Sequence, residues 1–289
     1  IGKKYLFVPE ENAKEASMIP DISIIAISNL RQAVTYLTKD TALQFVVPVN
    51  ISEIIKKDKE KMSRYDISHI IGQDHAKRAL TIAAAGGHNI LLEWPPGSGK
   101  TLLAKSFETL LPDLNFDEMI EISKIYSVAG KLEKGSSLVT TRPMRTIHHS
   151  ASTVSVIGGG RDSRPGEISL AHKWVLFLDE FLEFDSNLLE TLRQPLEDGE
   201  ITINRINASC TYPAKFVLIG AMNPCPCGYL GDRSKQCICN PNTIERYRKK
   251  LSWPIIDRID LMIRVPRVLE SDLHTKSTWR KTSDEYRSD

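Results

Sequence analysis

Apolar residues in this chain gather in short runs that alternate with stretches of helical spacing. Three runs, at Asn89–Leu92, Val175–Leu178 and Phe216–Ala221, have strand length and are almost entirely apolar. A strand that is apolar at successive positions is buried on both faces, which is typical of a parallel sheet. Helical stretches such as Asp74–Gly86 and Ser186–Glu197 separate the runs. The pattern therefore predicts an α/β fold in which crossover helices flank a parallel sheet.

The first fifty residues are predicted to form a smaller α/β unit of their own. A strand at Tyr5–Val8 is followed by a turn at Pro9–Asn12 and a helix, then by a strand at Ile22–Ile27 and a helix from Asn29. Residues 52–66 are highly charged and have little apolar periodicity, as linkers and solvated helices do. We therefore expect a domain boundary there.

Composition narrows the class of protein without naming a partner. The chain has 289 residues, of which 41% are hydrophobic and 26% charged, as in ordinary globular domains. Its apolar runs fall far short of the roughly 20 residues that a membrane-spanning helix needs, so no membrane partner is expected. The 38 Lys and Arg nearly balance the 36 Asp and Glu, and any nucleic-acid surface must therefore be local. No leader sequence follows Ile1, so the expected location is cytoplasmic.

A Gly-rich loop between a predicted strand and a predicted helix has the sequence of a phosphate-binding loop. Small residues let backbone N–H groups close around a phosphate at a helix N-terminus, where the helix dipole favours an anion. Lys100 would neutralise phosphate oxygens, and the Thr101 hydroxyl would hold Mg²⁺. The Gly-Lys-Thr ending argues against a simple turn. The predicted ATP-binding residues of the loop are Pro96, Gly97, Ser98, Gly99, Lys100 and Thr101.

Two later strands end in polar residues that suit ATP hydrolysis. Asp179 and Glu180 directly follow the run Val175–Leu178. In a parallel sheet they would lie beside the phosphate loop, where Asp179 would bind Mg²⁺ and Glu180 would polarise the attacking water. Asn223 follows a third strand and could orient that water. Taken alone these are an ordinary strand end and a turn former, but the phosphate loop upstream favours the catalytic interpretation.

Four of the five cysteines form a tight cluster. Cys225 and Cys227 make one C-x-C pair, and Cys237 and Cys239 make a second. Four thiolates returning to one point suit tetrahedral Zn²⁺ in a reducing compartment. The spacing within each pair is tighter than usual for zinc, so a disulfide or oxidised cluster remains an alternative. Cys210 lies outside the pattern and is expected to be a buried, inert thiol.

Together these residues identify a family resemblance. The chain resembles the magnesium-chelatase-like AAA+ ATPases of the competence protein ComM (YifB) family over nearly its whole length. The resemblance implies an AAA+ P-loop NTPase fold. Besides the motifs above, the segments that carry it are Ile71–Gln73, Ala76–Leu80, Gly87–Asn89, Arg142–Pro143, His148–Ser152, Ile157–Gly160, Pro165–His172, Arg193–Gly199, Ala221–Gly228 and Asp257–Asp260.

The resemblance also implies a division into domains. Residues 1–50 look like the C-terminal remnant of a Lon-protease-like (ribosomal S5-like) α/β domain, which precedes the ATPase in this family. Residues 51–66 would be a linker, and residues 67–268 the magnesium-chelatase-like ATPase core. Residues 269–289 would begin a truncated C-terminal lid. The sensor 2 arginine expected from that lid falls outside the chain.

A ring, usually a hexamer, with ATP between subunits is the assembly that the resemblance implies. Arg258 is the candidate arginine finger, since a neighbour's guanidinium can neutralise γ-phosphate charge only in the assembled ring. An ion pair with Asp257 or Asp260 in the same chain is the alternative.

The family's insertion region corresponds to residues 128–172, which in such rings tend to face the central channel. Arg142, Arg145, His148 and His149 could touch a nucleic-acid backbone there. Adjacent histidines also suggest a metal, but their side chains would diverge on a strand. A structural role in a loop is the alternative.

The leading functional hypothesis is an ATP-driven ring motor that acts on DNA, with ATP and Mg²⁺ as cofactors and Zn²⁺ as a further candidate. The nucleotide chemistry follows from the residues, whereas the DNA comes from the resemblance. The alternatives are a magnesium-chelatase-type remodelling subunit and an ATP-dependent protease acting through the Lon-like domain.

Three tryptophans occupy positions where glycine is expected. Trp94 stands at the first glycine of the phosphate-loop pattern, and Trp174 and Trp253 replace glycines of the family. An indole needs room that a glycine site rarely offers. One cause would explain all three: some bacteria read UGA as glycine, and translation with another code prints Trp. The alternative is a diverged homologue whose Trp94 obstructs the nucleotide pocket. Trp279 would follow the same rule only if its codon is UGA.

Overall fold

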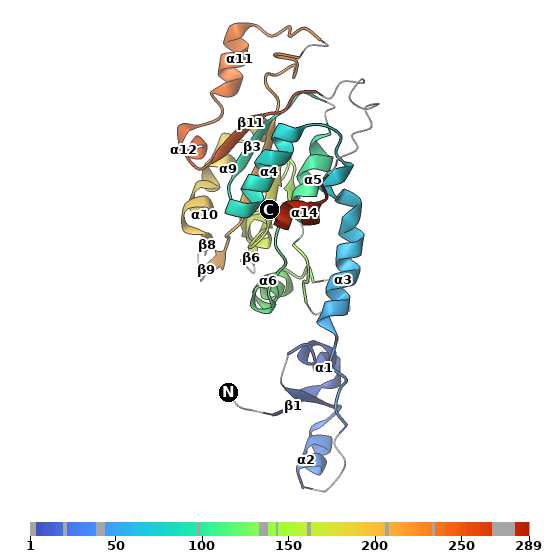
Figure 1. Ribbon diagram of the computed structural model, residues 1–289. Helices are drawn as coiled ribbons and strands as arrows, with labels where there is room; N and C mark the ends of the chain where they lie inside the picture. Colours follow the sequence, from blue (N-terminus) through green and yellow to red (C-terminus); the bar gives the residue numbers. More distant parts are fainter. Residues whose placement is uncertain are drawn as a thin grey trace.

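A small N-terminal unit and a larger α/β body are joined by one long helix (Figure 1). The computed structural model describes residues 4–19, 22–38, 44–96, 99–132, 138–142, 144–160, 163–205, 208–232, 235–267 and 281–288.

The N-terminal unit is a β-α-β arrangement, as the sequence predicts. Strands β1 (Tyr5–Pro9) and β2 (Ser23–Ile27) pair in parallel, with α1 (Glu10–Ala16) as the crossover, and α2 (Leu30–Thr38) follows. The predicted turn after β1 is wrong, because helix α1 begins at Glu10. Its first turn carries two glutamates, which the positive end of the helix dipole favours.

The charged segment that follows is a helix, α3 (Ile51–Met62). No residue of this helix is fully buried among the described residues, but the apolar side chains Ile51, Ile54 and Ile55 are partly buried against a cluster around α6 (Phe116–Val128). The charged side of the helix therefore faces the solvent, while a short apolar stripe packs against the body.

Parallel strands form the centre of the body. In the described part of the chain the sheet has the order β11-β3-β10-β7-β4 and every pairing is parallel. The three inner strands confirm the prediction within one residue at either end. The five strands are β3 (Ile90–Glu93), β4 (Met144–Ile147), β7 (Val175–Leu178), β10 (Val217–Met222) and β11 (Leu261–Arg264).

Helices and two small hairpins surround this sheet. The predicted stretch Ser186–Glu197 is split into two helices at Leu192, and the hairpin of β8 and β9 was not predicted. The remaining elements are η1 (Ser63–Tyr65), η2 (Ile67–His69), α4 (Asp74–Gly86), α5 (Lys100–Leu110), α7 (Thr153–Ile157), β5 (Gly158–Gly159), β6 (Arg164–Pro165), α8 (Glu167–Leu170), η3 (Phe181–Glu183), α9 (Ser186–Thr191), α10 (Arg193–Asp198), β8 (Glu200–Arg205), β9 (Ala208–Pro213), α11 (Pro241–Arg248), α12 (Trp253–Ile256) and α14 (Ser283–Ser288).

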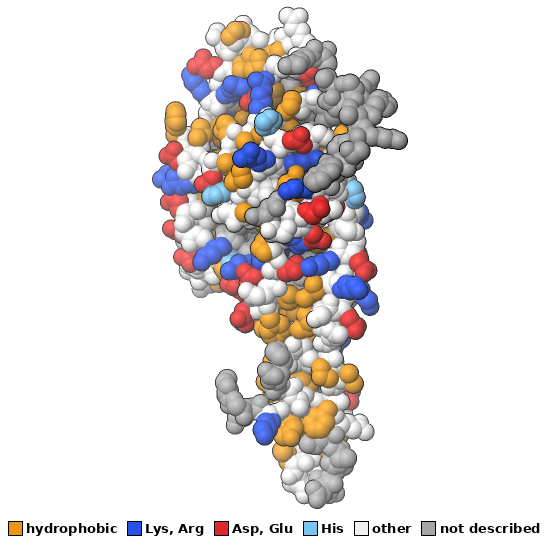
Figure 2. All heavy atoms as spheres, viewed as in Figure 1, with side chains coloured by type: hydrophobic (Ala, Val, Ile, Leu, Met, Phe, Trp, Pro, Cys, Tyr) orange, Lys and Arg blue, Asp and Glu red, His pale blue; other side chains and the backbone are white. Residues whose placement is uncertain are grey.

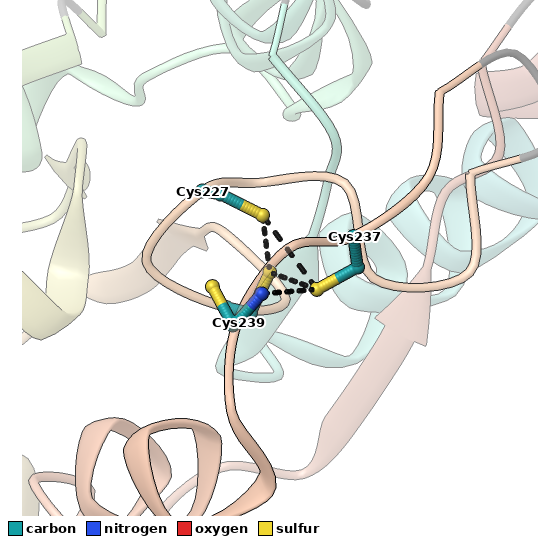
Figure 3. A group of neighbouring side chains, drawn as sticks. Cys227, Cys237 and Cys239 are labelled. Carbon is teal, nitrogen blue, oxygen red and sulfur yellow. Dashed lines mark hydrogen bonds between the residues drawn. The ribbon is translucent and has the colours of Figure 1, made fainter.

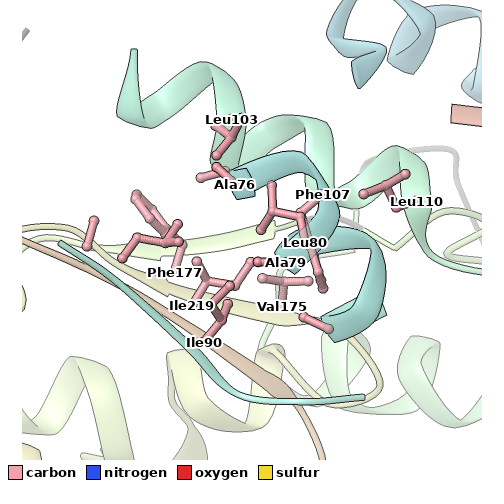
Figure 4. Close-up of a cluster of buried hydrophobic side chains, with 14 of the residues drawn as sticks. Ala76, Ala79, Leu80, Ile90, Leu103, Phe107, Leu110, Val175, Phe177 and Ile219 are labelled. Atoms are coloured by element: carbon pink, nitrogen blue, oxygen red, sulfur yellow. The ribbon is translucent and has the colours of Figure 1, made fainter. Parts of the chain in front are cut away.

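The core lies on both faces of the sheet. On one face, Leu80 of α4 and Phe107 of α5 belong to a buried cluster with Val175, Phe177 and Ile219 of the strands (Figure 4). A second buried cluster, which includes residues of β7, β10, η3 and α9, covers the other face. Burial on both faces explains why the inner strands are continuously apolar.

The face of the molecule seen in Figure 2 shows no large patch of like charge. Lys and Arg side chains alternate there with Asp and Glu over the body. This agrees with the near balance of 38 basic and 36 acidic residues.

Candidate functional site

The residues predicted to handle ATP meet at the carboxyl edge of the sheet. Lys100 is the first residue of α5, and its Nζ donates a hydrogen bond to Oδ1 of Asn223 at 2.7 Å, directly after β10. Burial lowers the pKa of Lys100, while the carboxylates of Asp179 and Glu180 raise it. The structure therefore brings together an ammonium, an amide and two carboxylates from three different segments.

The phosphate loop leads into α5 with an open helix N-terminus. Gly99 has φ of +82°, a backbone conformation that glycine adopts easily, and its carbonyl accepts the first bonds of α5 from Leu102 and Leu103. The first N–H groups of the helix are therefore free to face an anion. Gly97 and Ser98 lie outside the described residues, and so does the side chain of Thr101.

Glu180 is held in an unusual backbone conformation. Its φ and ψ of 55° and 48° place it in the left-handed region, and its N–H donates to Oδ1 of Asp179 at 2.9 Å. A non-glycine residue with positive φ is strained, and such strain is common at functional sites.

His149 is the neighbour of Glu180 that sequence reasoning missed. Its Nδ1 lies 2.8 Å from Oε2 of Glu180, a close polar contact without the alignment of a hydrogen bond. Strand β4 pairs with β7 so that Ile147 lies opposite Leu178, which places the residues after both strands side by side. Only the register of β4 could have revealed this contact.

The expectation that the two histidines diverge is wrong, because both lie beyond the end of β4. Their ring centroids are 4.1 Å apart, and Nδ1 of His148 contacts Oγ of Ser150 at 2.9 Å. Ring nitrogens of both histidines and a carboxylate oxygen of Glu180 lie within 4.8 Å of one another.

The two arginines of the insertion region are engaged inside the chain. Arg142, whose side chain is 13% exposed, donates to Oε2 of Glu118 at 3.0 Å and to two backbone carbonyls. Arg145 donates to Oε2 of Glu167 at 2.6 Å. Both guanidinium groups are therefore engaged with carboxylates of the chain itself, and a contact with a nucleic-acid backbone would require them to exchange these partners.

Arg258 lies at the amino ends of the strands, whereas Lys100 lies at their carboxyl ends. Its carbonyl accepts a hydrogen bond from the side chain of Asn89, the residue before β3, at 2.8 Å. Its guanidinium pairs with Glu197 of α10, and not with Asp257 or Asp260 as the alternative proposed. A role for Arg258 at a nucleotide therefore requires the nucleotide of another subunit.

The four clustered cysteines converge as the sequence predicts, and Figure 3 shows Cys227, Cys237 and Cys239 with their sulfur atoms turned toward one another. The Sγ of Cys225 lies 3.4 Å from that of Cys227 and 3.7 Å from that of Cys237, and the last two are 3.6 Å apart. The Sγ of Cys239 completes a group in which all four lie within 4.8 Å of one another. Zn–S bonds of about 2.3 Å imply tetrahedron edges of about 3.8 Å, so the spacing fits one ion.

The chemistry of these thiols also suits a metal. The cysteines are free, and their sulfur spacing far exceeds a disulfide bond of about 2.05 Å. Burial raises the pKa of Cys227, but N–H groups of Tyr229 and Ile238 outweigh it and lower the pKa to about 6. Cys210 is half-buried on β9, which corrects the expectation of a fully buried thiol.

Two of the three unexpected tryptophans are buried without a hydrogen-bond partner. Trp94 and Trp174 are 0% and 1% exposed, and neither indole Nε1 has a partner in the described part of the chain. Buried indole N–H groups usually find one. Trp94 belongs to the core cluster of α4 and α5, so its ring does not protrude beside the phosphate loop, whereas Trp253 is 77% exposed.

This fold, a parallel sheet flanked by helices, is that of an AAA+ type of α/β protein. Residues 66–273 match the family described as "Magnesium chelatase, subunit ChlI". The chain is 42% identical over 290 residues to Competence protein ComM of Haemophilus influenzae, covering 99% of this chain and 55% of that protein. The chain therefore belongs to the magnesium chelatase ChlI family, and it is similar to ComM over nearly its whole length.

Two further similarities agree with this assignment. YifB of Escherichia coli is 41% identical over 266 residues, which cover 92% of this chain and 50% of YifB. The fold also resembles a cryo-EM-based structure of the BchI and BchD subunits of magnesium chelatase, with a TM-score of 0.50 and 19% identity over 77% of this chain and 69% of that one. The chain spans about half the length of the curated relatives it matches.

No helix in the described residues is both long and apolar enough to cross a membrane.

Proposed function

We propose that this protein binds and hydrolyses ATP at the carboxyl edge of its sheet. The observation that carries the proposal is the convergence of Lys100 with Asn223, Asp179 and Glu180 at the N-terminus of α5. Helix N-termini and lysine ammonium groups bind phosphate, and carboxylates at the end of the neighbouring strand suit a hard cation. ATP and Mg²⁺ are therefore the expected cofactors.

Each residue then has a separate task. Pro96, Gly97, Ser98 and Gly99 shape the loop around the phosphates, and Lys100 balances their charge. The hydroxyl of Thr101 and the carboxylate of Asp179 are oxygen donors of the kind that Mg²⁺ prefers. When bound, Mg²⁺ supplies charge neutralisation at the phosphate oxygens.

Glu180 is the proposed base for the attacking water. Its backbone is in the left-handed region and its N–H donates to Asp179. In the proposal, Asp179 serves the cation and Glu180 the water. Asn223 is bonded to Lys100 and can position the same water by its amide.

We further propose that the working form is a homo-oligomeric ring, with six subunits as in related motors. The support is the position of Arg258 at the edge of the sheet away from Lys100. Packed against a neighbour, Arg258 would have to exchange Glu197 for phosphate oxygens. A guanidinium with five donors suits both partners.

DNA is the proposed substrate of the motor, as the resemblance to the ComM group implies. With Arg142 and Arg145 engaged inside the chain, their guanidinium groups are not the proposed contacts. The test is ATP hydrolysis by the whole protein with and without single-stranded DNA. Stimulation by DNA supports the proposal, and equal rates over a range of DNA concentrations would contradict it.

We also propose that Cys225, Cys227, Cys237 and Cys239 hold one Zn²⁺. The spacing of the sulfur atoms and the absence of a disulfide between these four cysteines support this. Metal analysis of protein purified under reducing conditions should find close to one zinc per chain. A folded cluster without metal would contradict the assignment.

A further inference from the structure

Residues 224–240, here called the cysteine loop, carry the proposed zinc ligands and directly follow a residue of the proposed ATP site. The loop begins immediately after Asn223, the partner of Lys100, and ends at α11. The loop therefore joins the proposed zinc site to the proposed ATP site.

Arginines from two elements fasten the backbone of the cysteine loop to the strand before the phosphate loop. Arg248 donates to the carbonyl of Pro224 at 3.4 Å, and Arg264 donates to the carbonyl of Leu230 at 2.6 Å. Both arginines also pair with Glu93, the last residue of β3, at 3.1 and 3.4 Å. The half-buried carboxylate of Glu93 thus links β3 to α11 and β11, and the two arginines extend this link to the cysteine loop.

A direct contact joins the cysteine loop to the phosphate loop. Gly228 has φ of +82°, and a Cβ on it would lie 2.5 Å from Cγ of Pro96. Only the absence of a side chain lets the loop lie this close to the turn that opens the phosphate loop. A shift of residues 225–228 would therefore displace Pro96. It would also displace Asn223, which precedes Cys225 by two residues.

The loop has almost no apolar core of its own. Ile238 is 87% exposed, whereas Cys225 is fully buried among the thiols and the end of β10. With so little apolar burial, the shape of the loop depends on what gathers the four sulfur atoms. Metal binding is a common source of folding energy for such segments.

We propose that zinc in the cysteine loop acts as a clamp that keeps the ATP site assembled. Bound Zn²⁺ fixes Cys225 and Cys227, and through the adjoining backbone it sets the positions of Asn223 and Pro96. Loss of the ion loosens both and weakens nucleotide binding. This inference rests on the proposed ATP site and on the proposed zinc ion, and it adds a dependence of the first on the second.

The first test compares zinc content with nucleotide affinity in the whole protein. Cys237→Ser removes a ligand that lies far from Asn223 along the chain, and Cys210→Ser is the matched control outside the loop. We expect Cys237→Ser to lose its zinc and to bind a fluorescent ATP analogue about tenfold more weakly, a typical coupling between two sites. Cys210→Ser should keep both properties.

A reversible version avoids the question of whether the variant folds. Wild-type protein is stripped with a chelator in Mg²⁺-free buffer, measured for binding of the analogue, and then given back stoichiometric Zn²⁺. Affinity should fall on stripping and recover on zinc addition, with circular dichroism unchanged outside the loop's small contribution.

The second test keeps the zinc and breaks the contact. Gly228→Ala retains all four thiolates but places a methyl group against Pro96. It should retain one zinc per chain and yet bind the analogue several-fold more weakly, which the loss of a ligand cannot explain.

The outcomes separate the three claims. Wild-type protein without zinc overturns the zinc site, and wild-type protein that binds no ATP overturns the proposed function. Zinc-free protein with unchanged affinity, or Gly228→Ala with unchanged affinity, overturns the clamp while leaving the other two intact.

Discussion

At the scale of single residues, the contact between His149 and Glu180 is the feature most open to test. The imidazole Nδ1 lies 2.8 Å from the carboxylate that is proposed to activate water. We infer that His149 is a positioning residue that holds Glu180 in one orientation. It acts through Glu180 and does not itself contact the phosphates.

Removing this imidazole should slow hydrolysis without weakening ATP binding. His149→Ala is expected to lower kcat about tenfold, which corresponds to about 1.4 kcal/mol in the barrier. The affinity for ATP should stay unchanged because Lys100 keeps its contacts. Steady-state kinetics with His75→Ala, an exposed histidine on α4, provides the control. Parental kcat in His149→Ala would end the positioning role.

The tryptophans raise a second question at this scale. Burying Trp94 and Trp174 leaves two indole N–H groups without partners in the described residues, which costs free energy on the order of 1–3 kcal/mol for each unsatisfied donor. Glycine at both positions would have no such donor to satisfy. The structure thus adds a physical reason to suspect that the printed residue is not the translated one.

Reading the gene decides this. Codon UGA at positions 94, 174 and 253 is the expected result, together with glycine at those positions in the mass spectrum of protein from the native organism. Codon UGG would refute the decoding explanation and would leave a core that truly buries two unpaired indoles.

At the scale of elements, Glu108 connects α5 to the edge strand β4. Its carboxylate accepts a hydrogen bond from the backbone N–H of Met144, the first residue of β4. Burial raises the pKa of Glu108 to about 7, although this hydrogen bond and Lys105 oppose the shift. The folded state therefore holds a proton that the unfolded state releases near pH 4.5.

The sign of the pH dependence follows. A raised carboxyl pKa means that the native state binds more protons between about pH 4.5 and 7, so this group's contribution to stability is full below that window and is lost as the pH rises through it. Glu108→Gln cannot ionise, and it should gain stability relative to the parent between pH 5 and pH 8. Urea unfolding at both pH values measures the difference. If the stabilities of the parent and of Glu108→Gln changed equally with pH, Glu108 would not be the group responsible.

Elements also show how far sequence reasoning can go. The inner strands and helices α4 and α5 could be predicted because complete burial leaves an unmistakable apolar pattern. Strands β4 and β11 are half exposed at the sheet edges and carry mixed residues, so their pattern is weak. The contacts of His149 and Arg258 depend on those two segments. For that reason the individual motifs could be predicted, whereas the arrangement around them could not.

For the cysteine cluster, the spatial arrangement itself could be predicted from the sequence. Its spacing alone predicted convergence, because four thiols within fifteen residues have few other uses. What the spacing could not predict is the packing of Gly228 on Pro96, which depends on how the loop returns to the sheet.

At the scale of the whole molecule, Lys100 and Arg258 lie at opposite ends of the strands of one sheet. This is the basis of the proposal that each ATP site is completed by a neighbouring subunit. Arg258→Ala should reduce hydrolysis by about 10³-fold or more, within the range known for arginine fingers. Arg193→Ala is a matched control, since Arg193 also pairs with Glu197, at 3.0 Å, and should have little effect.

Mixing variants tests the position of the finger directly. Lys100→Ala subunits lack the phosphate site but retain Arg258, and Arg258→Ala subunits have the reverse. Each should be inactive alone, and mixed rings should regain part of the activity. An inactive mixture that still assembles, by light scattering, would contradict a finger supplied by the neighbour.

The central claim is that ATP is bound by Lys100 and hydrolysed with the help of Glu180, and one paired measurement tests it most directly. Binding and turnover of ATP are measured for the parent, Lys100→Ala and Glu180→Gln. Lys100→Ala should bind no ATP, because the phosphates lose their principal counter-charge. Glu180→Gln should bind ATP as the parent does and turn it over at least about 10²-fold more slowly, the usual value of a general base. Parental turnover in Glu180→Gln, or parental binding in Lys100→Ala, would contradict this account of the site.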